Sequence, residues 1–485
     1  MIEGGGLHGL DLVKKGLVRL KANGLKTLVY VDPDVDGFIA AYFIIHALKG
    51  MGIEYSIYIN PLRKHGFFLD PEEIGGKYNV INGDFHIENE ILEELVSRGS
   101  TVLSLDHHEL ADKDLVFFRN DQEVGVTINN QYPFENPENR YESGAGIVRD
   151  VFASVLGGKF KSEEFNALGA ITLLSDIRNI ENKHARRQLE LLYNYPYKGE
   201  IKRLADGVLD GKRVYSFGKP RMERGFVDYT FVPSINAMIR LGQEKEALAF
   251  ILGEGRFPSQ DRPQDRQKRV LKYLEKQMVE VQMNRLTVIR LPGEGNFSNF
   301  LGLVCSKAVE RTGRSVLGFS TDERGTVNRA SFRGQIENVP YRTELSRIMD
   351  AAGHEIAFGV RDFKPTPELF KAADSIIQKI EFGKKTWNRV LEVKNLEKMN
   401  NSGELRALAE ENNFLLSPNM VRLRYTGGQA RIEREGEKFR KWKIGSLEVL
   451  QFVGTLHVKD IENLLIIPGT EKGMLQLTVD AIFEP

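Results

Sequence analysis

The chain has 485 residues, more than one hydrophobic core usually holds, and this length predicts two to four domains. Its 67 basic and 67 acidic residues balance, which argues against a coat protein for nucleic acid but allows a local basic groove beside an acidic site. The single cysteine, Cys305, excludes an intramolecular disulfide, and no cysteine–histidine spacing suggests a zinc site. Because no apolar run suits a signal peptide or a membrane span, we expect a cytoplasmic protein without a membrane partner.

The first part of the chain alternates between strand-like and helix-like segments. Short β-type runs occur at residues 27–31, 53–60, 78–84 and 101–106. Helical patterns follow at residues 37–49, 88–99, 143–158 and 165–176, and Ser143 is a candidate helix N-cap. Strands that alternate with helices predict an α/β fold with a doubly wound parallel sheet and helices on both of its faces.

The rest of the chain changes character twice. Residues 196–290 are mostly helical and end in a charged amphipathic stretch that we interpret as a long connector. Residues 291–380 return to α/β alternation, and the last hundred residues carry alternating β-type segments. We therefore expect a first α/β domain (1–195), a helical connector (196–290), a smaller α/β domain (291–385) and a β-rich C-terminal domain (386–485).

Acidic residues follow the predicted strands at the positions where ligands bind in such sheets. Asp32, Asp34 and Asp36 alternate directly after the first strand and before a helix. Taken alone, this segment is equally well explained as an aspartate-rich turn that caps a helix. Further candidates end other core elements, and their number makes the turn explanation insufficient: Asp84, the triplet Asp106-His107-His108, and Asp176.

This donor set indicates hard divalent metal ions. Carboxylate oxygens with one or two imidazoles suit Mn²⁺ or Mg²⁺ rather than thiophilic metals. Two such ions about 3.5–4 Å apart clamp the attacking and leaving oxygens of a phosphoryl displacement and supply hydroxide near neutral pH. The donor set therefore suits a site for two divalent ions that could serve a phosphoryl displacement.

The same residues resemble, in order, the four motifs of the DHH phosphoesterases, and further segments resemble the RecJ-like nucleases of that family. The first domain matches at Asn60-Pro61-Leu62-Arg63 with Gly66-Phe67, and at Ser143-Gly144-Ala145-Gly146. The connector matches at residues 233–242, which include Asn236 and Arg240. The accessory DHHA1 domain of the family is matched by residues 301–306, by Ser331-Phe332-Arg333, by Gly353-His354 and by Ala357-Phe358-Gly359. The resemblance covers roughly residues 27–380.

The resemblance implies a role for each matched residue. The metals would be held by Asp32, Asp34, Asp36, Asp84, Asp106, His107 and Asp176, with Asp84 as the bridge and Asp32 either a ligand or a partner of one. His108 and Arg63 would contact the scissile phosphate. The remaining substrate contacts would come from Ser143, Asn236 and Arg240 in the first part of the chain, and from Ser331, Arg333, Gly353 and His354 in the second α/β domain.

Some positions depart from the family pattern. Ala351-Ala352 replaces part of a glycine run, Phe358 stands where a small residue is common, and Met238-Ile239 replaces a small pair. Without the resemblance, Gly353-His354 would be interpreted as a helix C-cap followed by a surface histidine. These departures concern the geometry of substrate binding rather than the metal chemistry.

The C-terminal region has a basic segment with interleaved aromatic residues. Residues 422–443 hold eight basic and three acidic side chains, together with Tyr425, Phe439 and Trp442. Such a segment suits a groove for single-stranded nucleic acid on an OB-like domain. It is equally compatible with a solvated β-hairpin whose aromatic side chains face the core.

Three functions remain open at this point. The favoured one is a metal-dependent exonuclease on single-stranded DNA, with RNA as the other polymer, that works 5′ to 3′ in repair or recombination beside replication or repair proteins. The second is a phosphodiesterase for short oligonucleotides or cyclic dinucleotides, a reaction for which a two-lobed core suffices. The third is a non-catalytic replication-associated binding protein, which predicts eroded carboxylates, and none of the motif carboxylates is eroded.

Overall fold

The computed structural model separates the chain into two units, Met1–Gln264 and Asp265–Pro485. It describes residues 10–60, 66–108, 118–120, 123–129, 142–176, 183–209, 222, 224–293, 297–336, 339–381, 390–412, 422–426, 430–435, 439–452, 464–471 and 474–482. Among these described residues, no helix is both long and apolar enough to cross a membrane.

Unit 1 is built on a six-stranded sheet whose strands follow the order β2-β1-β3-β4-β6-β5. All neighbouring strands are parallel except the edge pair β5-β6. The sequence analysis correctly expected a parallel sheet. Its strands are β1 (Lys26–Val31), β2 (Tyr55–Ile59), β3 (Tyr78–Gly83), β4 (Val102–Asp106), β5 (Phe118–Asn120) and β6 (Glu123–Asn129).

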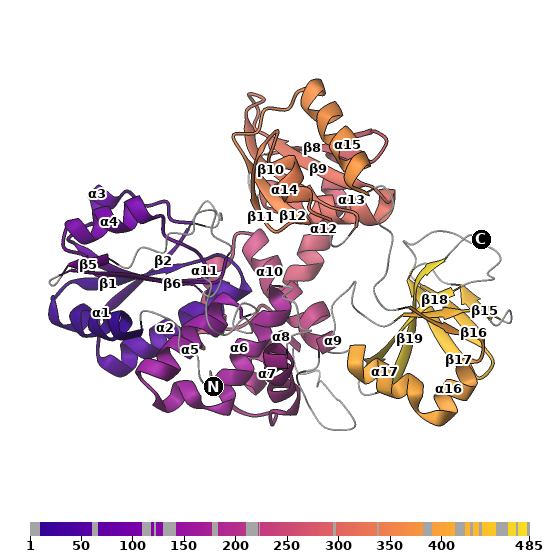
Figure 1. Cartoon of the computed structure of the whole chain (residues 1–485), viewed down its shortest axis with the longest axis horizontal. Coiled ribbons are helices and arrows are strands. Elements are labelled where there is room, and N and C mark those ends of the chain that lie inside the picture. The colour runs from indigo at the N-terminus through magenta and orange to yellow at the C-terminus, as the bar shows by residue number, and fades with distance from the viewer. Residues whose placement is uncertain are drawn as a thin grey trace. The chain divides into compact units, whose positions relative to one another are not determined.

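Helices cover both faces of this sheet (Figure 1). One face carries α1 (Leu10–Ala22), α2 (Val35–Met51) and α5 (Gly144–Val155), and the other carries α3 (Pro71–Ile74) and α4 (Asn89–Ser97). The unit is completed by a helical region that contains α6 (Glu163–Ser175), α7 (Lys183–Asn194), α8 (Gly199–Leu209), α9 (Arg224–Phe226), the π-helix η3 (Val227–Phe231), α10 (Val232–Arg240) and α11 (Glu244–Ile251).

Helix α2 fixes the position of the aspartates at its start. Thirteen of its seventeen residues are buried, so it forms the centre of the hydrophobic core of unit 1. Its N-cap is Asp34, whose side chain accepts a hydrogen bond from the Gly37 amide at 2.8 Å. Asp36 therefore lies in the first helical turn, whereas the sequence analysis placed the helix start at Gly37. Asp34 therefore does cap a helix, as the simpler interpretation of this segment predicted. It also lies close to other carboxylates.

Unit 2 contains a second sheet with the order β11-β12-β10-β9-β8-β7. The predicted connector ends earlier than expected, because α12 (Pro263–Gln277) gives way to strand β7 (Val279–Gln282), where valines alternate with polar residues. Helix α13 (Leu301–Thr312) packs on β9 and β10, and α14 (Tyr341–Leu345) and α15 (Pro367–Glu381) join the core with β8. The other strands are β8 (Leu286–Pro292), β9 (Ser315–Thr321), β10 (Val327–Arg333), β11 (Asp350–Gly353) and β12 (Ala357–Arg361).

The C-terminal region of unit 2 forms a seven-stranded mixed sheet with two short helices, which confirms its predicted β-rich character. Tyr425 and Trp442 lie in its hydrophobic core, only 6% and 2% exposed. Of the two interpretations left open by the sequence, the one in which the aromatic side chains face the core is therefore correct for Tyr425 and Trp442. The side chain of Phe439 lies outside the described residues. The elements are β13 (Val390–Val393), α16 (Leu396–Ser402), α17 (Glu404–Asn412), β14 (Arg422–Tyr425), β15 (Ala430–Glu435), β16 (Phe439–Ile444), β17 (Leu447–Phe452), β18 (Leu464–Glu471) and β19 (Met474–Ile482).

Candidate metal centre

The candidate site of unit 1 lies where the direction of strand addition reverses. The chain adds β2 on one side of β1 and β3 on the other, so the segments that follow β1 and β3 diverge at the carboxyl edge of the sheet. Such a switch point leaves a crevice in open α/β sheets. Asp32, Asp34 and Asp36 follow β1, Asp84 follows β3, and Asp106 with His107 ends β4.

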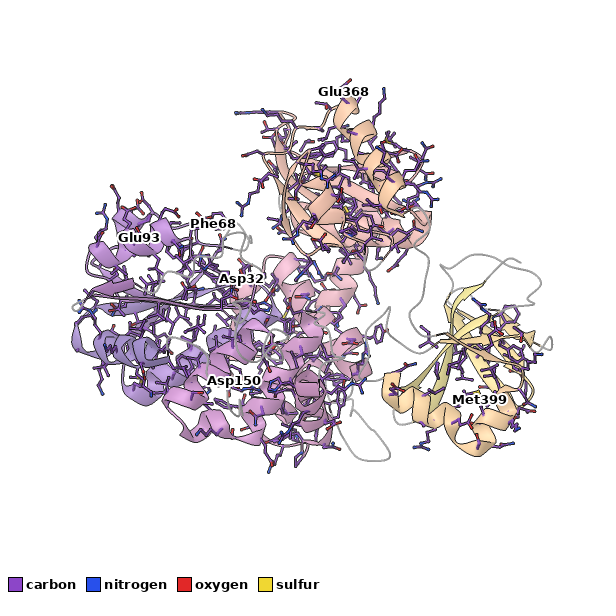
Figure 2. All side chains as sticks on the ribbon, viewed as in Figure 1. Asp32, Phe68, Glu93, Asp150, Glu368 and Met399 are labelled. Carbon is purple, nitrogen blue, oxygen red and sulfur yellow. The ribbon has the colours of Figure 1, made fainter. Side chains whose placement is uncertain are left out.

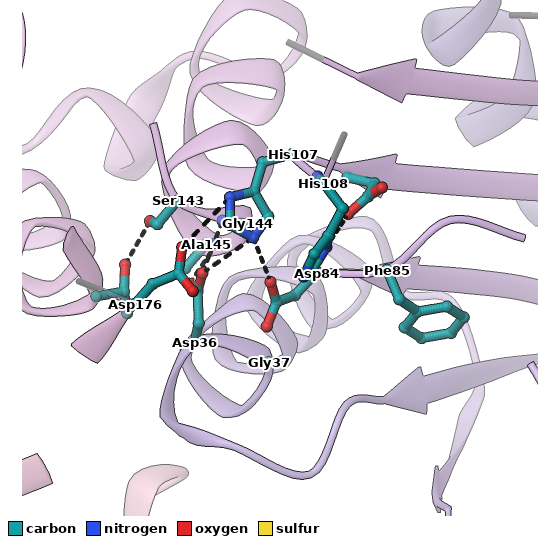
Figure 3. Close-up of polar contacts among 12 residues, drawn as sticks. Asp36, Gly37, Asp84, Phe85, His107, His108, Ser143, Gly144, Ala145 and Asp176 are labelled. Atoms are coloured by element: carbon teal, nitrogen blue, oxygen red, sulfur yellow. Dashed lines mark hydrogen bonds and ion pairs between the residues drawn. The ribbon is translucent and has the colours of Figure 1, made fainter. Parts of the chain in front are cut away.

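His107 lies at the centre of this arrangement (Figure 3). Its Nε2 is 2.9 Å from Asp84 Oδ1 and 3.8 Å from Asp36 Oδ2, and its Nδ1 is 3.6 Å from Asp176 Oδ2. Its Nδ1 also lies 3.2 Å from the Glu142 carbonyl oxygen, which can only accept a hydrogen bond, so Nδ1 carries the proton. In the neutral ring Nε2 is then the nitrogen that can bind a metal.

Asp84 belongs to two groups of potential ligands. Its carboxylate lies within 4.8 Å of ligand atoms of Asp32 and Asp34 in one group, and of His107 and His108 in another. A third group joins Asp36, His107 and Asp176. Asp84 also has a φ of 76°, a left-handed conformation that aspartate and asparagine tolerate better than most residues. The shared position of Asp84 is the geometry that a bridging ligand needs.

The start of helix α5 holds Asp36 in place. The Gly144 and Ala145 amides each donate to the Asp36 carboxylate at 2.8 Å, and Ser143 caps the same helix. Gly144 also makes room for Asp84, since a Cβ at position 144 would lie 2.6 Å from Asp84 Cβ and 2.7 Å from Asp84 Cα. A glycine is therefore required at position 144, where the start of α5 contacts Asp84.

We expect Gly144→Ala to reduce catalytic activity about a hundredfold, because the added methyl group must displace Asp84 or the start of α5, and small displacements of reacting groups have effects of that size. The measurement is the initial rate of phosphodiester hydrolysis at saturating Mn²⁺. Gly50→Ala in α2 is the matched control, since nothing lies within 4 Å of its added Cβ. Equal rates for the two variants would contradict the expectation that Gly144 makes room for a functional Asp84.

Asp106 has a different environment from the other carboxylates. It is fully buried, and its Oδ1 accepts a hydrogen bond from His108 Nδ1 at 2.8 Å, while Asn129 donates to Oδ2 at 3.1 Å. Burial raises the pKa of Asp106, but its interactions with His108 and His107 outweigh burial and hold that pKa below its usual value. Asp106 is absent from the ligand groups found among the described residues. As the structure stands, it orients His108, whose side chain is 32% exposed.

The charge of the cluster fits a bound cation. Burial, and then the neighbouring carboxylates, raise the pKa values of both Asp36 and Asp84 well above the usual range. Several carboxylates held together away from water are unfavourable unless positive charge accompanies them. Oxygen donors with one imidazole are the ligands that Mn²⁺ and Mg²⁺ accept, so the donor set fits the metals expected from the sequence.

The geometry agrees with comparisons to known proteins. No family model matches the chain. In solved structures, RecJ of Thermus thermophilus in complex with Mn²⁺ superposes with a TM-score of 0.64 at 19% identity, over 99% of this chain and 72% of that one. The chain has the RecJ fold. A second structure, exonuclease RecJ bound to manganese, superposes with a TM-score of 0.53 at 20% identity, over 77% of this chain and 94% of that one.

Two curated relatives share sequence with this RecJ-like chain. YorK of the SPbeta prophage in Bacillus subtilis, whose name describes a single-strand DNA-specific exonuclease, is 26% identical over 273 residues, which are 53% of this chain and 44% of YorK. The single-stranded-DNA-specific exonuclease RecJ of Bacillus subtilis is 25% identical over 365 residues, 69% of this chain and 43% of that protein. The chain thus spans less than half the length of the curated relatives it matches.

The remaining predicted residues of the RecJ-like unit 1 have distinct environments. Asn236 of α10 lines a small pocket of about 60 Å³ with Asp34, Asp36 and Asp176. Arg240 does not line that pocket, and Arg63 lies outside the described residues. Ser143 is fully buried, with its hydroxyl bonded to the Gly146 amide and the Thr172 hydroxyl, which indicates a role in holding α5.

In unit 2, Ser331 and Arg333 project from β10 beside the start of α13. Arg333 donates to the Ser331 hydroxyl at 2.9 Å, and a Cβ at Gly302 would lie 2.6 Å from the Arg333 guanidinium. Burial lowers the pKa of Arg333, and no carboxylate pairs with it within the part of the chain that the structure describes. A guanidinium next to a helix N-terminus and without an acidic partner is a suitable site for an anion.

Gly353 ends strand β11 and His354 begins the turn of the β11–β12 hairpin, so the helix C-cap interpretation is wrong. The amides and carbonyls of His354 and Ala357 bond to each other across this turn. Gly353 has a φ of 133°, and a Cβ there would lie 3.0 Å from the Ala357 carbonyl oxygen. Phe358, the departure noted in the sequence, stacks on Phe332 with ring centroids 4.8 Å apart and belongs to the core.

A buried polar network beside the candidate metal centre was not predicted from the sequence. Its charged members are nearly inaccessible, with Glu142, Arg149 and Asp150 exposed by 2%, 1% and 5%. His184 and Gln188 of α7 complete it. The available signal was weak, consisting of the glutamate directly before Ser143 and the spacing of His184 and Gln188, four residues apart on one helix face.

Proposed function

We propose that this chain is a metal-dependent exonuclease that hydrolyses phosphodiester bonds of single-stranded DNA, starting at a 5′ end. The observation that carries the proposal is the convergence of Asp84 and His107, each shared between groups of potential metal ligands, at the switch point of a RecJ-like sheet. The names of YorK and of Bacillus subtilis RecJ support the choice of single-stranded DNA.

The metal ligands in this proposal are Asp32, Asp34, Asp36, Asp84, His107 and Asp176. Bound there, two Mn²⁺ or Mg²⁺ ions would supply an activated water and stabilise the charge that develops on the phosphate. The protein contributes rigidity, because Asp36 accepts two amide hydrogen bonds from α5 and the tautomer of His107 is set by the Glu142 carbonyl. Ligands that are already fixed need little rearrangement during the reaction.

His108 is the candidate contact for the scissile phosphate. Asp106 accepts the hydrogen bond of its Nδ1 and stabilises the charged ring, and Asn129 holds both Asp106 and the His108 carbonyl oxygen. In this proposal the His108 ring donates a hydrogen bond to a phosphate oxygen or a leaving oxygen. In this proposal Asp106 positions His108 rather than binding a metal.

End recognition is assigned to unit 2. Arg333 and Ser331, beside the start of α13, would bind a terminal phosphate, and the hairpin at Gly353-His354 would contact the adjacent nucleotide. An exonuclease has to recognise the end of a strand, and a second site that binds a terminal phosphate serves that purpose.

The proposal is tested by digestion of single strands labelled at one end, with Mn²⁺ or Mg²⁺. We expect mononucleotide release from the 5′ end of linear single-stranded DNA, and resistance of closed circular single strands and blunt duplexes. Parallel reactions use single-stranded RNA, a cyclic dinucleotide and a linear dinucleotide.

The outcomes separate the candidate functions. Equal cleavage of circular and linear strands would exclude end recognition. Fast hydrolysis of dinucleotides without hydrolysis of long strands would favour the small-substrate phosphodiesterase, and release from 3′ labels first would reverse the proposed polarity. Tight single-strand binding without hydrolysis under any metal would indicate a binding protein.

A further inference from the structure

The buried network beside the proposed metal centre joins the start of α5 to α7 by hydrogen bonds. Asp150 accepts two hydrogen bonds from Arg149, both residues of α5, and Arg149 also donates to the Gln188 side chain of α7 at 2.9 Å. Gln188 donates to the Glu142 carboxylate, which also contacts His184 Nε2. Figure 2 labels Asp150 among the helices of unit 1.

The network leaves no room for larger residues around its charged groups. A Cβ at Gly146 would overlap the Glu142 carboxylate, and one at Gly169 of α6 would lie 3.1 Å from the Arg149 guanidinium. The network therefore restrains α5, α6 and α7 at the point where residue 142 enters α5.

The segment that begins at Glu142 contacts two proposed metal ligands directly. The Glu142 carbonyl oxygen bonds to His107 Nδ1 at 3.2 Å, and the next amides, those of Gly144 and Ala145, bond to Asp36. Any rotation of the Glu142 backbone would therefore move the partners of both ligands together. Groups that orient metal ligands in this way affect metal affinity about 10–100-fold.

We propose that the Glu142–His184 pair is a positioning clamp, which sets the segment 142–145 so that His107 and Asp36 are held in their metal-binding geometry. The proposal rests on the metal centre assigned above. It differs from the orientation of His108 by Asp106, because the clamp acts through the main chain of residue 142 and is anchored on α7.

A third metal site is the competing explanation for these residues. Ligand atoms of Glu142, Asp150 and His184 lie within 4.8 Å of one another. The Arg149 guanidinium, however, contacts Asp150 directly and already provides positive charge at that position. A dication there would sit next to a buried cation, which is unfavourable. The experiment below distinguishes the two explanations by stoichiometry.

The test measures Mn²⁺ binding to the metal-stripped full chain by isothermal titration calorimetry, supported by electron paramagnetic resonance of free Mn²⁺. The variants are Glu142→Gln, His184→Gln and their combination. Glu381→Gln is the matched control, because Glu381 is also a buried glutamate that accepts hydrogen bonds, from Ser315 and Tyr341, but it belongs to unit 2. Circular dichroism verifies that each variant is folded.

We expect each single variant to weaken Mn²⁺ binding about 10–100-fold with an unchanged number of ions, and the double variant to lose little more. The Mn²⁺ concentration needed for half-maximal hydrolysis should rise in parallel, while saturating Mn²⁺ restores most of kcat. The control should keep the affinity of the original protein. His184→Gln is the milder change, since the His184 side chain is 16% exposed, so it tests the clamp even if Glu142→Gln misfolds.

Three results would overturn the inference in different ways. Unchanged Mn²⁺ affinity in folded Glu142→Gln and His184→Gln would show that the pair does not position the ligands. Loss of one bound ion with unchanged affinity for the others would establish the third metal site instead. Failure of the original protein to bind Mn²⁺ would refute the metal centre itself, and with it the proposed function.

Discussion

Replacing Asp84 with asparagine should lower phosphodiester hydrolysis about a thousandfold or more while the protein stays folded. Asp84 is the carboxylate shared by two groups of potential ligands, so its loss removes a bridge as well as a charge. Asparagine keeps the size of the side chain and tolerates the φ of 76° found at this position, whereas alanine would add backbone strain to the loss of the ligand. The measurements are single-turnover hydrolysis rates and Mn²⁺ stoichiometry.

Asp261→Asn provides the control for this change. Asp261 is an exposed aspartate of unit 1 with a φ of 51°, so the substitution repeats both the chemistry and the backbone requirement away from the site. Near-normal turnover of Asp84→Asn with Mn²⁺ would remove Asp84 from the catalytic centre. A similar loss in both variants would point to a general effect of the substitution on the fold.

Replacing Arg333 with methionine should raise KM for 5′-phosphorylated single strands about 10–100-fold, because one or two hydrogen bonds between charged groups are lost. The effect on strands with a 5′ hydroxyl should be much smaller. The thermal stability of the protein should not fall, because burial already disfavours the charged form of Arg333 and no carboxylate among the described residues loses a partner. Steady-state kinetics on the two substrates and thermal unfolding measure these quantities.

Arg347→Met is the companion variant for this experiment. Arg347 is an arginine of the same unit with its side chain 69% exposed, and it pairs with Glu344 at 2.9 Å. Its replacement should leave KM for both substrates unchanged. If Arg333→Met weakened binding of both kinds of strand equally, Arg333 would contact the strand generally and would not recognise its end.

The strands and the clustering of the aspartates at one sheet edge could be predicted because both depend on local sequence. Apolar runs near residues 27–31 and 78–84 specify buried strands, and in a parallel sheet their carboxyl ends must meet at one edge. The aspartates that follow these strands therefore converge whatever the details of the loops. The boundary at β7 was missed because a four-residue alternation is too short to stand out against the charged helix before it.

Interactions between helices could not be predicted in the same way. Nothing in the sequence around Glu142 indicates that its carboxylate meets His184, 42 residues later, because that contact depends on how α5 and α7 both pack on α6. The role of Asp106 was also hidden, since only the structure shows its carboxylate bonded to His108 and Asn129. The function of the basic and aromatic residues in the C-terminal region was ambiguous for a related reason. Alternation along a strand does not show which face of the sheet is covered by other residues. In the structure, Tyr425 and Trp442 lie on the face that the hydrophobic core covers.

The sharing of ligands has a consequence for how the proposed centre fills. Asp84 and His107 each belong to two of the ligand groups, so the first ion to bind would fix side chains that the second ion also needs. The second ion would then bind to side chains that are already ordered, so the protein would bind the second ion more tightly than the first. Such uptake is cooperative, so at limiting Mn²⁺ the molecules would divide mainly between empty and fully loaded forms. Activity would then rise with metal concentration more steeply than two independent sites allow.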